Sequence, residues 1–222
     1  MALAKDQLIE ITHYSNGQSI PYLLTTKDGN APIKYVLIVM PGGAGILNPR
    51  MINEQISIQA SRNFLIRSRE LFADQETAVI STDATVNTER MTAIIEDAKA
   101  RFPNNKTYII GTSKSTISTM YLASSLDGKV SGFIHTSSMA SISSLDTRDF
   151  KSRQLIVHHE NDGCYVTPYG SAKANHERYG TDFISIEGGI SIGDACQAFA
   201  YHGYNGIEQE VIDKIKTWIK SQ

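Results

Sequence analysis

The sequence is poor in the features that define several protein classes. It holds only two cysteines among 222 residues, too few for a disulfide scaffold or a cysteine-based structural zinc site. No apolar run approaches the roughly 18 residues that cross a bilayer as a helix. The first residues, MALAKDQLIEITHY, lack a basic segment followed by an apolar one, so we expect no signal peptide in this sequence.

Charge is nearly balanced, with 21 lysines and arginines against 23 acidic residues and a formal net charge of −2. The basic residues are scattered, whereas a nucleic-acid partner requires a clustered basic face. Hydrophobic residues make up 41% and charged residues 20%, which is typical of a globular chain rather than a disordered one. We therefore expect one α/β domain over residues 1–222, with neither a nucleic-acid partner nor a transmembrane segment.

The order of patterns along the chain predicts the fold class. Residues 8–12 and 20–26 are strand-like, and Asn16-Gly17 between them favours an antiparallel hairpin. The nearly continuous apolar run at 34–40 is typical of a strand covered on both faces, and it ends in a glycine-rich turn. Strand-like and helix-like segments then alternate, which predicts a mostly parallel central sheet with helices on both faces. The later strands are expected at 77–82, 107–112, 130–138, 153–160 and 181–187. Helices are expected at 63–74, 88–102, around 117–121 and 207–220, with a further one that begins at Thr167-Pro168 and ends at Gly180.

The strand at 107–112 runs directly into Gly111-Thr112-Ser113-Lys114-Ser115 and then into a helix. This resembles the G-x-S-x-G nucleophile elbow, a sharp strand-to-helix turn that holds a serine at its apex, with Ser115 in place of the second glycine. An N-cap serine at an ordinary helix start is the alternative interpretation. The pentapeptide alone does not choose between them.

A nucleophilic serine needs a histidine base and a carboxylate that orients the base. Asp162 follows the strand at 153–160 and could face the sheet edge, although an Asp-Gly turn residue is the alternative. His202 lies in a loop just before the final helix, in the chain order serine, acid, histidine, and is the expected base. Of the remaining histidines, His13 precedes the serine, and His135 and His158 lie in strands. His159 adjoins the acid loop and His176 falls in a helix.

The third requirement is a pair of backbone N–H groups that stabilise the developing oxyanion. The residue after the nucleophile, Lys114, supplies one of them. The glycine-rich turn after the strand at 34–40 supplies the other, from Gly43 or Ala44, because glycines let the backbone turn its amides inward.

Together the segments MPGGAG, GTSKST, HHENDGC and HGYNGIE resemble the α/β-hydrolase superfamily, in particular small bacterial serine hydrolases of the esterase or dienelactone-hydrolase-like type, from about Tyr35 to the C-terminus. The resemblance implies Ser113 as nucleophile, Asp162 as acid and His202 as base, with no metal or cofactor. It implies a carboxylesterase-like enzyme acting on a small ester, thioester or amide. The short segment MASISSLDTRDF leaves little room for a cap, so an open site is expected. NFLIRSRELF resembles an early helix of some members, where we favour packing and surface roles for Asn63 and Arg67.

Other functions remain open at this point. An acyltransferase would use the same acyl-enzyme, and a binding protein could keep the fold without activity. A dinucleotide-binding protein is the weakest alternative, because Gly43-x-Gly45-x-x-Asn48 lacks the third glycine of that signature.

The two cysteines lie near the proposed acid and base. Cys164 follows Asp162 by two residues and Cys196 precedes His202 by six, so loops that bring the acid and base together also bring the thiols together. We therefore expect a Cys164–Cys196 disulfide, the alternative being two independent buried thiols. The bond would imply an oxidising compartment such as the periplasm, and its absence the cytoplasm.

Overall fold

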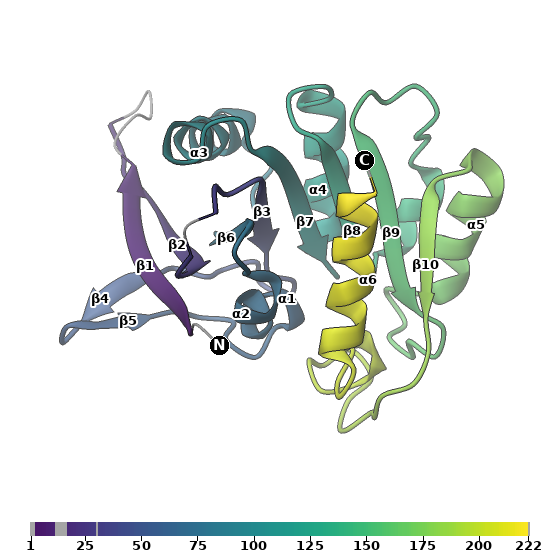
Figure 1. Cartoon of the computed structure of the whole chain (residues 1–222). Coiled ribbons are helices and arrows are strands. Elements are labelled where there is room, and N and C mark those ends of the chain that lie inside the picture. The colour runs from purple at the N-terminus through teal and green to yellow at the C-terminus, as the bar shows by residue number, and fades with distance from the viewer. Residues whose placement is uncertain (1–2, 12–16, 30, 222) are drawn as a thin grey trace.

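The computed structural model describes residues 3–11, 17–29 and 31–221. Eight strands form one sheet in the order β1-β2-β6-β3-β7-β8-β9-β10, as seen in Figure 1. From β6 to β10 all neighbours are parallel, whereas β1 and β2 are antiparallel to each other and β2 to β6. The strands are β1 Ala4–Ile11, β2 Ile20–Lys27, β3 Tyr35–Met40, β6 Thr77–Ser81, β7 Lys106–Thr112, β8 Gly132–Thr136, β9 Arg153–His159 and β10 Asp182–Ile186.

The predicted mixed sheet with antiparallel N-terminal strands is confirmed. The antiparallel pairing runs from Ala4 opposite Lys27 to Ile11 opposite Ile20. The turn predicted at Asn16-Gly17 is only partly covered, because Asn16 lies outside the described residues.

Helices cover both faces of the sheet because its central strands are apolar on both sides. On β3, Leu37 and Val39 join the core under one layer of helices, and Val36 and Ile38 join the core under the other. Parallel neighbours require such crossovers, since the chain must return across the sheet between strands. One layer holds α1 Phe64–Arg67, α2 Arg69–Phe72 and α6 Glu208–Lys220, and the other holds α3 Thr88–Arg101, α4 Ser115–Ser125 and α5 Tyr169–Tyr179.

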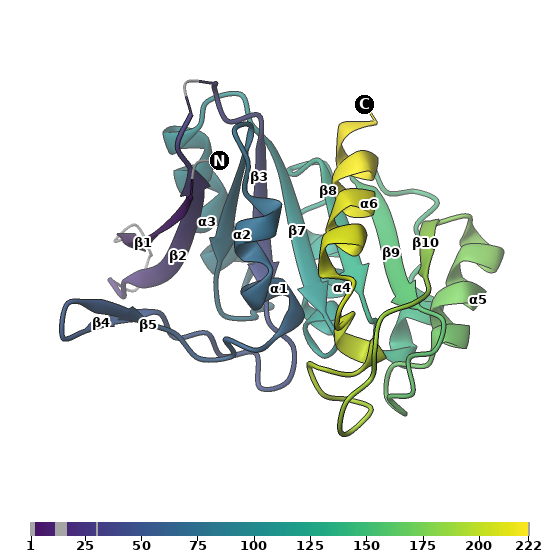
Figure 2. The ribbon, with the colours of Figure 1, turned by 60° about the horizontal axis from the view of Figure 1, so that its bottom comes forward.

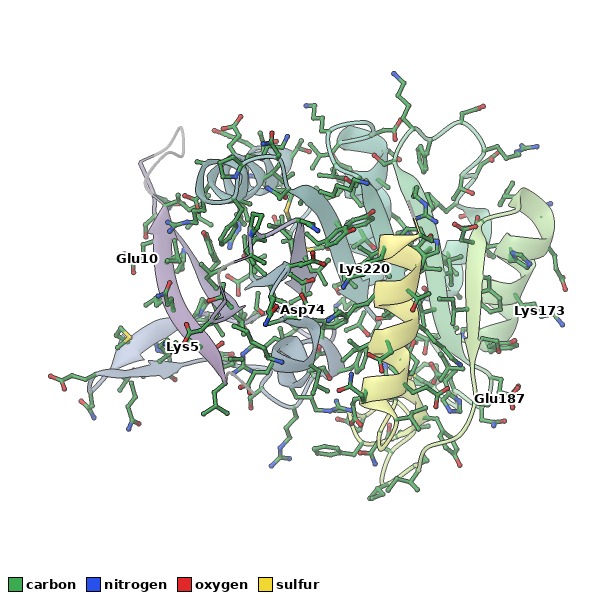
Figure 3. All side chains as sticks on the ribbon, viewed as in Figure 1. Lys5, Glu10, Asp74, Lys173, Glu187 and Lys220 are labelled. Carbon is green, nitrogen blue, oxygen red and sulfur yellow. A yellow bond between two sulfur atoms is a disulfide. The ribbon has the colours of Figure 1, made fainter. Side chains whose placement is uncertain are left out.

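Helix α6 is fixed to the sheet along its length. Its apolar face is buried, as its helical spacing predicts, through Val211, Ile212, Ile215 and Ile219. At its C-terminal half, Lys216 and Lys220 lie 2.6 and 3.5 Å from the carboxylate of Asp74, and Figure 3 shows Asp74 and Lys220 on neighbouring segments. The loop that enters α6 therefore ends on a rigid element.

Three local features differ from the sequence predictions. The segment expected as one helix over 63–74 divides at Ser68 into α1 and α2, because Phe64, Leu65 and Ile66 are all buried in succession rather than at helical spacing. An unpredicted hairpin, β4 Arg50–Ile52 and β5 Gln55–Ser57, projects from the body in Figures 1 and 2. Its strands have only three residues each, too short for a periodic signal.

The helix predicted after Thr167-Pro168 begins one residue later than expected. Pro168 occupies the N-cap position and Tyr169 the first helical position. The predicted end is confirmed, because Gly180 adopts the left-handed conformation that closes α5. No helix among the described residues combines the length and apolarity needed to cross a membrane.

His135 is a buried polar residue of the sheet on β8. Its Nδ1 lies 2.7 Å from Thr119 Oγ1 and its Nε2 lies 3.1 Å from Gln154 Oε1. Burial lowers the pKa of His135 to about 4, because removal from water disfavours the charged imidazolium. The imidazole is therefore neutral in the folded protein near pH 7.

We predict that this histidine makes the protein less stable in acid. Its unfolded pKa is about 6.5, so between pH 6.5 and 4 the unfolded state binds the extra proton. Stability then falls with falling pH by up to about 1.4 kcal/mol per pH unit. Urea unfolding of His135→Gln, which does not titrate there, should show a flatter pH dependence than the wild type. Equal slopes in the two proteins would contradict this.

Candidate active site

A cavity of about 760 Å³ opens where the parallel strands end. Figures 1 and 2 show the loop that precedes α6 at this end of the molecule, beyond the arrowheads of β7 and β9. Parallel sheets of this kind place their sites at the carboxyl ends of strands. Six segments contribute the lining: Gly42-Gly43, Arg62 to Phe64, Thr112 to Lys114, Met139, Cys164 to Val166, and residues from Asp194 to Gly203 that include Cys196, Gln197, Ala198 and His202.

Ser113 lies at the apex of a sharp turn between β7 and α4, with a backbone φ of 54°. This left-handed conformation costs an L-residue about 1 to 2 kcal/mol, so surrounding contacts must maintain it. The turn is tight: a Cβ on Gly111 would lie 2.6 Å from Ser115 O, and one on Gly42 would lie 2.9 Å from Ser113 Cβ. The N-cap position of α4 belongs to Lys114 and forms no side-chain cap. The conformation is the one expected of an elbow rather than of a capping serine.

Ser115, which replaces the second glycine of the motif, closes the turn with its hydroxyl. Its Oγ accepts a hydrogen bond from the Thr112 N–H at 2.8 Å, and it can donate to Met40 O or Thr112 O, each 2.9 Å away. Met40 ends β3, the strand that leads into the glycine-rich turn. The serine that stands in place of glycine here therefore ties the elbow to that turn.

Asp162 and His202 are brought together, as the sequence predicts. His202 Nδ1 lies 2.9 Å from Asp162 Oδ2, and the same oxygen accepts from Thr167 Oγ1 at 3.1 Å and from His158 Nε2 at 3.2 Å. The other carboxylate oxygen accepts the Cys164 N–H at 2.9 Å. Burial acts to raise the pKa of Asp162, but hydrogen bonds from His158 and His202 hold it well below its usual range. The carboxylate is therefore charged and faces a histidine that lines the cavity.

The orientation of His158 follows from its second nitrogen. Nδ1 accepts the Ser138 N–H at 3.3 Å, so Nε2 carries the proton and donates it between Thr167 O at 3.0 Å and Asp162 Oδ2 at 3.2 Å. His158 is fully buried on β9, four residues before the carboxylate. The sequence placed it in a strand but did not indicate that it contacts Asp162.

The segment carrying His202 is anchored to the ends of β8 and β9. Ser137 Oγ donates to the His202 carbonyl at 2.7 Å, and the Ser137 N–H donates to Tyr204 Oη at 3.0 Å. Tyr204 Oη donates in turn to Val157 O at 2.8 Å. Gly203 is required for close approach, because a Cβ there would lie 2.0 Å from Ala198 O. Nothing local in the sequence marks Ser137 or Tyr204 as a support of this segment.

The two predicted oxyanion segments lie on the same cavity as Ser113. Gly43 and Lys114 both line it, whereas Ala44 lines a smaller neighbouring cavity of about 220 Å³. Gly43 has a φ of 62°, a conformation that favours glycine. Within residues 3–11, 17–29 and 31–221, no three histidine, cysteine or acidic side chains cluster in a way that could hold a metal ion.

The predicted Cys164–Cys196 disulfide is confirmed in the structure. The two Cα atoms are 4.5 Å apart and the residues are 32 positions apart in sequence. Both cysteines line the cavity. The bond therefore joins the loop of Asp162 to the segment that leads to His202.

Asn63 lies in the cavity wall just before α1, and Arg67, the last residue of α1, lies behind that wall. Asn63 lines the cavity, and its side chain caps α1 by accepting the Leu65 N–H at 3.1 Å. Arg67 does more than pack on the surface, because its guanidinium donates to Gly203 O at 2.6 Å and contacts Glu208 at 2.8 Å.

Solved structures with a similar fold are numerous, although no protein-family model and no curated protein matches the chain. A serine hydrolase without a lid from Xanthomonas campestris has a TM-score of 0.62 at 10% identity, covering 98% of this chain and 97% of its own. The chain has the α/β-hydrolase fold.

Two further structures with this fold are similar over nearly their whole length. The esterase domain of a Rhodothermus marinus protein has a TM-score of 0.67 at 12% identity, covering 96% of this chain and 97% of its own. Est1E from Butyrivibrio proteoclasticus has a TM-score of 0.67 at 15% identity, with the same coverage of 96% and 97%.

We predict that the disulfide stabilises this α/β-hydrolase fold. Replacing both Cys164 and Cys196 with alanine should lower the free energy of unfolding by about 2 to 4 kcal/mol, because the unfolded chain regains the entropy of an open loop. Guanidinium unfolding without reductant measures the difference, and the wild type in reductant is the matched control. Alkylation of untreated protein followed by mass spectrometry should find no free thiol; two modified cysteines per chain would contradict the bond.

Proposed function

We propose that the protein is a serine hydrolase that cleaves a small ester, thioester or amide through an acyl-enzyme on Ser113. The observation that carries the proposal is the left-handed backbone of Ser113 at the end of β7, on a cavity shared with a histidine paired to a buried carboxylate. A non-glycine residue in that conformation is costly. The cost is accounted for if the serine must project from the strand toward a substrate.

In the first step His202 removes the hydroxyl proton of Ser113 as its oxygen attacks the substrate carbonyl carbon. Nδ1 of His202 donates to Asp162, so Nε2 is the nitrogen left to accept this proton. The resulting imidazolium is stabilised by the Asp162 carboxylate, whose lowered pKa keeps it charged. His202 then donates its proton to the leaving group, which departs and leaves the acyl-enzyme.

The negative charge that develops on the carbonyl oxygen is held by the N–H groups of Lys114 and Gly43. Both residues line the cavity beside Ser113, and fixed amide donors of this kind stabilise an oxyanion without reorganising. Gly43 is preferred to Ala44, which lines the neighbouring cavity. Water activated by His202 then attacks the acyl carbon, and Ser113 is released with its proton restored.

We predict that Ser113→Ala abolishes turnover of p-nitrophenyl acetate. The loss of kcat should be on the order of a thousandfold or more, because no other group can form the acyl-enzyme. Ser124→Ala changes an exposed serine of α4, the helix that follows Ser113; it is the matched control and should retain full activity. Hydrolysis by Ser113→Ala at the wild-type rate would rule out this nucleophile.

We also predict a preference for short acyl groups. Between β8 and β9 the only regular element is the short helix η1, Ala140–Ser144, so no inserted helical cap covers the cavity from there. An uncapped site buries less of a long chain than an enclosed one. Values of kcat/KM for p-nitrophenyl esters should fall from acetate and butyrate to palmitate. A rise toward palmitate would contradict the open site.

A further inference from the structure

Arg67, at the end of α1, occupies a position between two walls of the cavity. Its side chain is only 17% exposed, which is unusual for arginine unless it is paired. One wall is the segment from Arg62 to Phe64, and the other is the segment from Ala198 to Gly203 that carries His202. A largely covered arginine here needs a physical explanation beyond surface solubility.

The guanidinium binds three partners, one each from the Arg62 segment, the His202 segment and α6. Nη1 donates to the Arg62 carbonyl at 2.8 Å, and Nη2 donates to the Gly203 carbonyl at 2.6 Å. Nη2 and Nε also lie 2.8 and 3.2 Å from Glu208 Oε1 at the start of α6. The rigid, planar fork of arginine suits such divergent contacts, which a single ammonium group cannot reproduce.

Aromatic rings fix the guanidinium further. Its Cζ lies 5.5 Å from the centre of the Phe199 ring and 5.9 Å from that of Phe64. Each ring belongs to a different wall, and contacts of this kind favour a cation near the ring. The positive charge is balanced by Glu208, whose Oε2 accepts the Gly206 N–H at 3.0 Å.

We propose that Arg67 is a positioning residue that holds the His202 segment at the distance from Ser113 that proton transfer needs. The inference rests on the proposed function. Gly203 follows His202 directly, so a contact that fixes the Gly203 carbonyl also fixes the backbone of the histidine. Arg67 fixes that carbonyl relative to Arg62 on the facing wall. Asp162 orients the imidazole ring, whereas Arg67 sets where the backbone that carries the ring lies.

Arg67→Ala tests the proposal against Arg69→Ala. Arg69 is similarly covered, with a side chain 15% exposed, and has its own carboxylate partner in Asp6 at 2.6 Å. Its contacts lie away from the cavity, on Asp6 and the Ile66 carbonyl. Both variants lose a partly buried ion pair, but only Arg67→Ala should lower kcat. The loss should be about ten- to a hundredfold with KM changed less, as small misplacements of reacting groups cause.

Two readouts separate positioning from general stability. Labelling of Ser113 by a fluorophosphonate should slow in Arg67→Ala in parallel with kcat, since both need the base in place. Millimolar guanidinium chloride, well below denaturing concentrations, should restore part of the kcat of Arg67→Ala by filling the vacated position. The same salt should leave Arg69→Ala and the wild type unchanged.

The outcomes distinguish this inference from the proposed function. Wild-type kcat in Arg67→Ala, or an equal loss in Arg69→Ala, would overturn the positioning role while leaving the hydrolase intact. A wild type that neither turns over esters nor reacts with the probe would overturn the proposed function itself. If Arg67→Ala does not fold, Arg67→Lys keeps the charge and should still show the loss of kcat; normal kcat in that variant would also reject the role.

Discussion

A buried, charged carboxylate must be surrounded by donors, and the donors of Asp162 come from three parts of the chain. One oxygen accepts from His158 on β9, from Thr167 just before α5 and from His202 before α6. An isolated charge at this depth would cost several kcal/mol, so these segments converge on the carboxylate or the site does not form. The position of the predicted base is thus a consequence of neutralising one buried charge.

The nucleophile side of the site depends on a different constraint, the close approach of backbones. β7 and the turn after β3 lie so near each other that a side chain on Gly42 would collide with Ser113. Ser115 joins the two with hydrogen bonds to Thr112 and Met40. The turn that carries Gly43 and the turn that carries Ser113 are therefore held together, as the proposed oxyanion site requires of donors that do not reorganise.

The parts of this candidate site that could be predicted are those with a local sequence pattern at the end of a strand or the start of a helix. A strand that ends in Gly111 and a serine, an aspartate just past a strand and a histidine before the last helix each leave a local pattern. Ser137, Tyr204 and Arg67 leave none, because their roles arise only when distant segments meet. The hairpin β4–β5 escaped prediction because its short strands are largely exposed, and the break at Ser68 because buried residues in succession do not reveal a helix boundary.

The segment that carries His202 has two fixed ends. The disulfide at Cys196 ties its beginning to the loop of Asp162, and Arg67 binds Gly203 and Glu208 at its end. Between these points the Ser137 hydroxyl holds the His202 carbonyl. A long loop ordinarily samples many conformations. Restricting it to the reactive one during a reaction would cost conformational entropy. Because both ends are fixed, this entropy is lost when the protein folds. His202 is then already held against Asp162 and at the cavity before any substrate binds.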